Sequence, residues 1–431
     1  MYKTIYIGCI NRSGGSLLAR LFDGHPDVAV YPRELGFPFN LNIFAKYSGY
    51  TGGTPTYIPD YNGSDDVDVF DLLGMSRQKP EVILKWGKER SEPLGIRKNY
   101  LEKAFYQKVK TDFDYEGLLN SLNEYKKEAK SIKELYDAWH KAYFGAWDNG
   151  KYIKNAKFVT MHTSWGLYLT NIDKYFAEFE GSSFLHLLRD PMGQIASEKT
   201  RLARRHYGSR RFTYPPFPNI LVKTFKNYDM PAQIRKWKVA ITRLVLLQEK
   251  YGVNNKFVLC DHGNLLNHTE KTMRSLCGQI GLDYDESLLQ PTIAGEPWKG
   301  NSHQGSQKGI NKNLINYYPK VLTLEEIELI EKETGPIRDY LKNNKDTPLD
   351  LTKLPKNNLL DYEYQKKYFE DEEKLSLYYS VMIKTPRQMD VKAPDFSSVL
   401  AYFYSELVRI CHIPRMLKLR FFPNMGKQNY T

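Results

Sequence analysis

The sequence that decides the fold runs Thr4-Ile5-Tyr6-Ile7-Gly8-Cys9-Ile10-Asn11-Arg12-Ser13-Gly14-Gly15-Ser16-Leu17-Leu18. Its first five residues are apolar enough for a core strand, and helical periodicity continues from Gly15 to Phe22. A strand, a glycine turn and a helix N-terminus direct several backbone N–H groups at one point, where the helix dipole adds partial positive charge. The stretch therefore predicts a phosphate-binding loop.

Short apolar runs and helical stretches alternate through the following sequence. Further strands are expected at Lys157–His162, Ser183–Leu188 and Lys256–Cys260. Further helices are expected at Leu167–Phe179, Met192–Arg204, Pro231–Tyr251 and Glu270–Ile280. This alternation predicts an α/β fold of three layers and P-loop type, with a central parallel sheet flanked by helices.

Two regions stand outside the alternation. Residues 36–150 contain a Gly/Pro/Tyr-rich loop and then a charged helical stretch, and they are interpreted as a substrate-specific insertion between the first and second sheet strands. Near Pro348–Lys356 the composition shifts to Pro, Lys and Asn. The expected organisation is a domain of residues 1–345, including the insertion, followed by a C-terminal extension of residues 346–431.

The composition is that of a globular protein with an excess of positive charge. Of 431 residues, 41% are hydrophobic and 26% are charged, which excludes a disordered or fibrous chain. Lys and Arg number 62 against 50 Asp and Glu, a net charge of +12 that favours anionic partners. The four cysteines make no disulfide framework, and the scattered histidines predict no metal site. Without a signal peptide or membrane-spanning run, a cytoplasmic protein is expected.

A second candidate site lies where another predicted strand meets a helix. Leu188-Arg189-Asp190-Pro191 ends the strand, and Ser197 follows eight residues after Arg189. Asp190 suits a helix N-cap and Pro191 a first helical position, so a purely structural explanation exists. Alternatively, Arg189 and Ser197 donate together to a phosphate.

The glycine turn differs from a Walker A loop, because Gly15 stands where that motif has lysine, and the cation is Arg12 instead. Arg12-Ser13-Gly14-Gly15-Ser16-Leu17 with His25-Pro26 downstream resembles the 5′-phosphosulfate loop of sulfotransferases, most closely in the style of the tyrosylprotein and carbohydrate types. Arg189 and Ser197 resemble that family's 3′-phosphate site. The resemblance covers roughly residues 3–340.

The resemblance implies sulfuryl transfer from 3′-phosphoadenosine 5′-phosphosulfate to a hydroxyl or amine, with adenosine 3′,5′-bisphosphate as product and no metal. It implies the following cofactor-binding residues: Arg12, Ser13, Gly14, Gly15, Ser16, Leu17, Arg189, Ser197, Arg201, His262, Lys299, Gly300, Asn301 and Ser302. The family's usual Tyr-Glu-Asp-Leu is replaced by His262-Gly263-Asn264-Leu265.

Three residues are candidates for the chemistry. Glu34 lies close to the position of a catalytic Glu in related enzymes, although Arg33 occupies that position if the register shifts by one. His162 ends a predicted strand where relatives commonly have lysine; protonated it would supply charge, and neutral it would serve as a base. Arg12 would supply positive charge at the leaving oxygen. Each of the first two residues also has a structural explanation, a solvated loop acid or a core histidine.

Other functions and partners stay open at this point. A P-loop kinase and a basic nucleic-acid-binding protein are the alternative functions, although nucleic acid is not the expected partner. The acceptor is expected to be a carbohydrate, another small metabolite or a lipid-linked molecule, and the oligomeric state is open. The basic run from Lys199 to Arg211 is either a solvated helix face or a contact for an anionic acceptor. Residues 397–422 predict two short helices, of which the first packs on the core and the second presents a basic surface, with peripheral membrane contact as the alternative.

Overall fold

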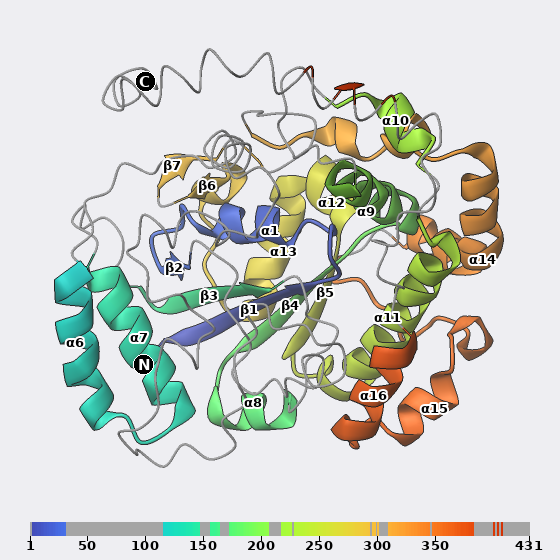
Figure 1. The fold of residues 1–431 in the computed structure, drawn as a ribbon. Coiled ribbons are helices and arrows are strands. Elements are labelled where there is room, and N and C mark those ends of the chain that lie inside the picture. Colours follow the sequence, from blue (N-terminus) through green and yellow to red (C-terminus); the bar gives the residue numbers. More distant parts are fainter. Residues whose placement is uncertain are drawn as a thin grey trace.

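A parallel sheet of five strands lies at the centre of the molecule (Figure 1). Its strands follow the order β2 (Val28–Val30), β3 (Phe158–Thr163), β1 (Lys3–Cys9), β4 (Ser183–Leu188) and β5 (Phe257–Asp261). The computed structural model describes residues 2–31, 115–146, 156–163, 172–206, 217–225, 228–293, 295–298, 300, 309–344, 347–382, 400, 403–404 and 407. All neighbouring strands of this sheet run parallel, which confirms the predicted α/β fold.

The two faces of the sheet are covered by different helices. Ile5 and Ile7 of β1 pack in one apolar cluster with α1 (Gly15–Phe22) and α13 (Thr269–Ile280), while Tyr6 packs in the opposite cluster. The second cluster contains Tyr175 of α8 (Ile172–Glu178) and Trp237 of α11 (Met230–Tyr251). Figure 1 shows α1 and α13 on one side of the strands and α8 on the other. Side chains that alternate along a strand in this way produce the three expected layers.

The described part of the insertion is a helical hairpin, α6 (Tyr115–Glu128) and α7 (Ile132–Gly145). Ser131 caps α7 by accepting a hydrogen bond from the backbone N–H of Glu134. Trp139 and Tyr143 pack against Tyr31, directly after β2. The expected position needs one correction, because β2 belongs to the sheet and precedes the insertion. The insertion therefore follows the second strand along the chain, not the first.

The strand and helix bounds agree closely with the prediction. Strand β4 and helix α1 have the predicted bounds, and β3 and β5 lie one residue further along. Helix α9 (Pro191–His206) begins one residue earlier than expected and continues two residues further. The first residues of the helix predicted at 167–179 lie outside the described residues, and α8 is its described part.

The C-terminal third adds helices around α11. Helix α14 (Leu324–Asn343) has a capping box formed by Thr323 and Glu326. Leu349 donates its backbone N–H to Leu259 of β5 at 2.9 Å, and it joins the main core cluster. The remaining elements are α10 (Asn219–Lys223), α12 (His262–Asn267), η2 (Glu286–Leu289), β6 (Thr292–Ile293), β7 (Glu296–Pro297), η3 (Lys312–Leu314), η4 (Tyr318–Lys320), η5 (Lys356–Asn358), α15 (Tyr362–Lys367) and α16 (Glu372–Met382). The described part of the extension thus packs on the same core as the sheet, and the boundary at residue 345 stays a prediction.

Candidate functional site

The predicted phosphate loop connects β1 to α1 through two residues in the left-handed region. Arg12 has φ +72° and Gly14 has φ +95°, and the backbone N–H of Ser13 donates to Ile10 O at 3.0 Å. A positive φ costs little at glycine but is unfavourable at arginine. The N-cap residue of α1 is Gly14, which has no side chain to bond the first turn, so the backbone N–H groups there suit an anion.

Glycines 14 and 15 make room for two histidines. A Cβ atom at Gly14 would lie 2.9 Å from Nε2 of His262, and one at Gly15 would lie 2.7 Å from Nε2 of His162. His162 comes from the end of β3 and His262 from the start of α12, directly after β5. The structure therefore brings both histidines predicted from the sequence to the loop, from two different strand ends.

His162 is buried and chemically unusual. The residue is only 4% exposed, and its Nε2 has no hydrogen-bond partner among the described residues. Burial and the positive charge of Arg20 lower the pKa of His162 to about 3. The imidazole is therefore neutral at pH 7, which suits a base and not a fixed positive charge.

Side chains of α9 are joined directly to the loop. Arg12 donates from Nε to Oγ of Ser197 at 3.1 Å, and Gln194 donates to the backbone oxygen of Asn11 at 2.8 Å. Arg189 donates from Nη1 to the backbone oxygen of Arg12 at 2.9 Å. The two motifs predicted separately from the sequence therefore form one site.

The position of Arg189 is fixed by residues that sequence reasoning missed. Its Nη2 donates to Leu314 O at 3.3 Å, and Trp237 donates to its backbone oxygen at 3.1 Å. Gly193 leaves room for the guanidinium, because a Cβ there would lie 2.8 Å from Nε of Arg189. Burial and the nearby Arg12 lower the pKa of Arg189 to about 10, so it stays charged at pH 7. An arginine has five N–H groups; its two bonds to described residues leave three for a ligand.

The described basic residues of α9 do not form the solvated face that was one of the two expectations. Lys199 is fully buried and pairs with Glu326 at 2.8 Å, and Arg204 is also buried. Arg201 makes a bidentate ion pair with Glu198. Burial raises the pKa of Glu198, but Arg201, Lys236 and Arg12 outweigh it and lower that pKa to about 2. Glu198 therefore places a permanent negative charge beside Ser197.

The other predicted site residues divide into placed and unplaced ones. Ser13 is buried, and its Oγ has no hydrogen-bond partner among the described residues. Ser16 and Leu17 lie partly exposed in the first turn of α1, and Gly300 has φ +77°. Glu34, Lys299, Asn301 and Ser302 lie outside the described residues.

Across the described part of the chain, no three His, Cys, Asp or Glu side chains group as a metal site would require. No helix there is long and apolar enough to cross a membrane.

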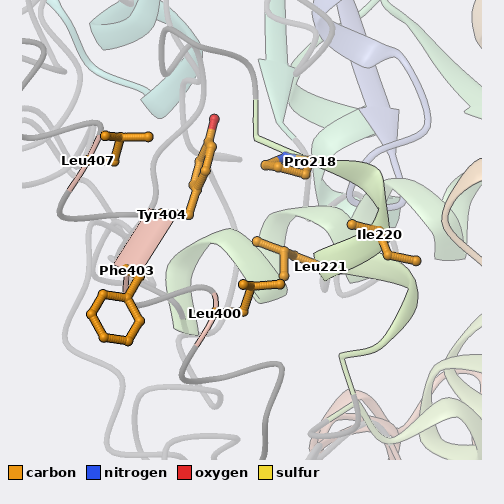
Figure 2. A pocket seen from close by; sticks show the side chains of 7 residues that line it. All are labelled: Pro218, Ile220, Leu221, Leu400, Phe403, Tyr404 and Leu407. Atoms are coloured by element: carbon orange, nitrogen blue, oxygen red, sulfur yellow. The ribbon is translucent and has the colours of Figure 1, made fainter.

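An apolar groove lies beside α10, where a described piece of the C-terminal region approaches it (Figure 2). It is lined by Pro218, Ile220, Leu221, Leu400, Phe403, Tyr404 and Leu407. Tyr404 packs edge-on against Phe217 with 5.7 Å between ring centroids. This contact agrees with the expectation that the first part of the tail packs on the core; the rest of the predicted tail helices lies outside the described residues.

Comparison with known proteins agrees with the family resemblance expected from the motifs. A model of the sulfotransferase family matches residues 121–286, which include His162, Arg189 and Ser197 but not the loop of residues 9–16. A sulfotransferase domain from the curacin biosynthetic pathway is similar, with 13% identity, a TM-score of 0.41 and coverage of 78% of this chain and 98% of that domain. The sulfotransferase domain of the Synechococcus PCC 7002 olefin synthase has 15% identity and a TM-score of 0.35, covering 77% and 94%. None of the curated proteins matches this chain.

Proposed function

We propose that this chain is a sulfotransferase that moves a sulfuryl group from 3′-phosphoadenosine 5′-phosphosulfate to a hydroxyl or amine of an acceptor, in line with the family model that matches residues 121–286. The donor supplies an activated sulfuryl group, whose bond to the phosphate oxygen breaks as a bond to the acceptor forms. The observation that carries the proposal is the connection of the two candidate anion sites through Arg12.

The residues present fit a ligand with two separate phosphate groups. The N-terminus of α1, where the N-cap residue Gly14 has no capping side chain, offers backbone N–H groups to one phosphate. Ser197 and the unused N–H groups of Arg189 offer donors at the start of α9. Two sets of donors linked by one residue suit a bisphosphorylated nucleotide better than a single phosphate.

His162 and Glu34 are the proposed bases. The neutral imidazole of His162, with an unpartnered nitrogen beside the loop, can accept the proton of an acceptor hydroxyl. Glu34 is retained as the alternative base, because it follows the strand β2 closely in the sequence. Arg12 would stabilise negative charge on the leaving phosphate oxygen.

The acceptor is proposed more broadly. A carbohydrate, another small metabolite or a lipid-linked molecule would each present the required hydroxyl or amine.

Peripheral contact with a membrane through the C-terminal tail remains part of this proposal. Cosedimentation of the full chain with anionic vesicles, compared with a version ending at Asp395, tests that contact; loss of binding on truncation is the expected result.

The donor is tested by calorimetric titration with adenosine 3′,5′-bisphosphate and with ADP, which lacks the 3′-phosphate. We expect the bisphosphate to bind more tightly, and Arg12→Ala and Arg189→Ala each to weaken it by about 1.5–3 kcal/mol. Arg274→Ala is the matched control, because it removes an exposed arginine of α13 paired with Glu270. Equal affinity for the two nucleotides would contradict the proposal, and turnover of ATP would favour the kinase alternative.

A further inference from the structure

Arg338 connects α14 to the start of α9. The residue is only 6% exposed, and its Nε donates to Oδ2 of Asp190 at 2.9 Å. Its Nη1 pairs with Glu331, two helical turns earlier on α14. Helix α14 lies beyond the residues that the family model matches. The contact with Asp190 therefore comes from a part of the chain outside the residues that the family model matches.

Asp190 also contacts the beginning of α9. Its second oxygen, Oδ1, accepts a hydrogen bond from the backbone N–H of Met192 at 2.9 Å. One carboxylate thus caps α9 and binds a buried cation of α14 at the same time. Because both oxygens are engaged, the carboxylate has little freedom to rotate, and the backbone that carries it is fixed as well.

The neighbour of Asp190 is Arg189, the proposed phosphate-binding arginine. The negative charge of Asp190 raises the pKa of Arg189, opposing burial and Arg12, which lower it. Trp237 fixes the backbone oxygen of Arg189 from α11. Arg338 and Trp237 thus restrain the Arg189–Asp190 pair from two different helices, and neither of them donates to the loop itself.

We infer that Arg338 is a positioning residue for the subsite formed by Arg189 and Ser197, an inference that rests on the donor proposed above. It acts through Asp190 and touches no ligand. Without Arg338, Asp190 loses its ionic partner and Arg189 is no longer held at the angle from which its N–H groups reach both Arg12 and a phosphate. Recognition of a 3′-phosphate weakens, whereas contacts to the 5′ side at α1 are preserved.

The experiment compares Arg338→Met, Asp190→Asn and Glu331→Gln by calorimetric titration with adenosine 3′,5′-bisphosphate and with ADP. Asparagine still caps a helix, so Asp190→Asn breaks the ion pair and keeps the cap. We expect Arg338→Met and Asp190→Asn to bind the bisphosphate about tenfold more weakly than wild type. Their affinity for ADP should stay within twofold of wild type. Glu331→Gln is the matched control, because it removes the other partner of Arg338 without touching Asp190. It is expected to leave both affinities within twofold.

The outcomes separate this inference from the donor proposal. An equal loss of affinity for both nucleotides, or no loss for either, in Arg338→Met and Asp190→Asn would overturn the positioning role. Wild-type protein that binds the two nucleotides equally would instead overturn the donor proposal. If Arg338→Met does not fold, Asp190→Asn and Arg338→Lys decide the question, since lysine restores a charge but not the Nε donor. Selective loss of bisphosphate affinity in Asp190→Asn supports the inference.

Discussion

His162 and His186 lie near the ends of the two strands that flank β1, but they face opposite sides of the sheet. His162 of β3 is level with Ile7, and its ring reaches the loop at Gly15 beneath α1. His186 of β4 is level with Gly8 and lies between Phe184 and Phe257, with ring centroids 6.4 and 6.3 Å away. One residue of register therefore separates a histidine at the candidate site from a histidine in an aromatic core.

Both histidines are buried, and burial lowers the pKa of both. The pKa of each is lowered to about 3, and burial is the first cause in both. The difference is that Arg20 contributes at His162, whereas no charged group contributes at His186. A perturbed pKa therefore does not identify a functional histidine; the groups that surround the ring do.

The largest effect expected from these histidines is loss of stability in acid. His140, His162 and His186 have a pKa near 3, and that of His262 is lowered well below 6.5, mainly by burial. The unfolded chain binds protons at these residues from about pH 6.5 downward, and the folded chain does not, so stability falls as pH falls from 6.5 toward 3. Four groups would remove roughly 5 kcal/mol between pH 7 and pH 5.5.

Urea unfolding at a series of pH values measures this loss. A free energy of unfolding that stays constant from pH 7 to pH 5.5 would show that the rings are hydrated or paired in solution. Such a result would show that the pKa of His162 and His186 is not lowered by burial.

Replacement of each histidine by alanine should then separate their functions. His162→Ala is expected to slow sulfuryl transfer by about 10²–10⁴-fold, the usual contribution of a general base. His186→Ala lies on the other face of the sheet and should change the rate less than threefold, although it opens a cavity and lowers stability. Single-turnover kinetics with saturating donor measures the chemical step, and circular dichroism confirms that both variants are folded. Equal rates in the two variants would remove the distinction.

A side chain added at Gly15 tests the contact between His162 and the loop. Its Cβ would lie 2.7 Å from Nε2 of His162 and 2.5 Å from Sγ of Cys9, so Gly15→Ala is expected to cost about 1–3 kcal/mol and to weaken nucleotide binding. Gly278→Ala is the control, because no atom lies within 4 Å of a Cβ there and the residue is inside α13. That control should be neutral or slightly stabilising. Combination of Gly15→Ala with His162→Ala should recover part of the lost stability; no recovery would assign the clash to Cys9 alone.

The sequence predicted those parts of the site that are local in the chain. The glycine turn and the Arg189–Ser197 pair are patterns of strand end and helix start, and both lie where predicted. Trp237, Leu314 and Arg338 were missed because they reach Arg189 or Asp190 from 48, 125 and 148 residues away. The burial of Lys199 could not be predicted, and a solvated face and a contact for an anionic acceptor both stayed open, because the residues that bond it come later in the chain. Periodicity shows where a helix is amphipathic, but not what packs on its polar side.

His186 was not singled out from the sequence, because a histidine in an apolar strand looks the same as His162 until both faces of the sheet are known. His186→Phe provides the smallest and most specific test of this difference. The two ring nitrogens of His186 have no hydrogen-bond partner among the described residues, so replacement by phenylalanine removes two buried polar atoms. The added volume is small but meets Gly8, where a Cβ would already lie 3.2 Å from Cδ2 of His186. We expect a net stabilisation of about 1 kcal/mol at pH 7.

That gain should grow by about a further 1 kcal/mol at pH 5.5, because only three of the four buried histidines then remain to destabilise the folded chain in acid. Urea unfolding at the two pH values measures both numbers. His162→Phe is the comparison: it should show the same change in pH dependence and lose activity. If His186→Phe has the pH dependence of wild type, His186 is not the neutral, unpartnered ring that its aromatic surroundings indicate.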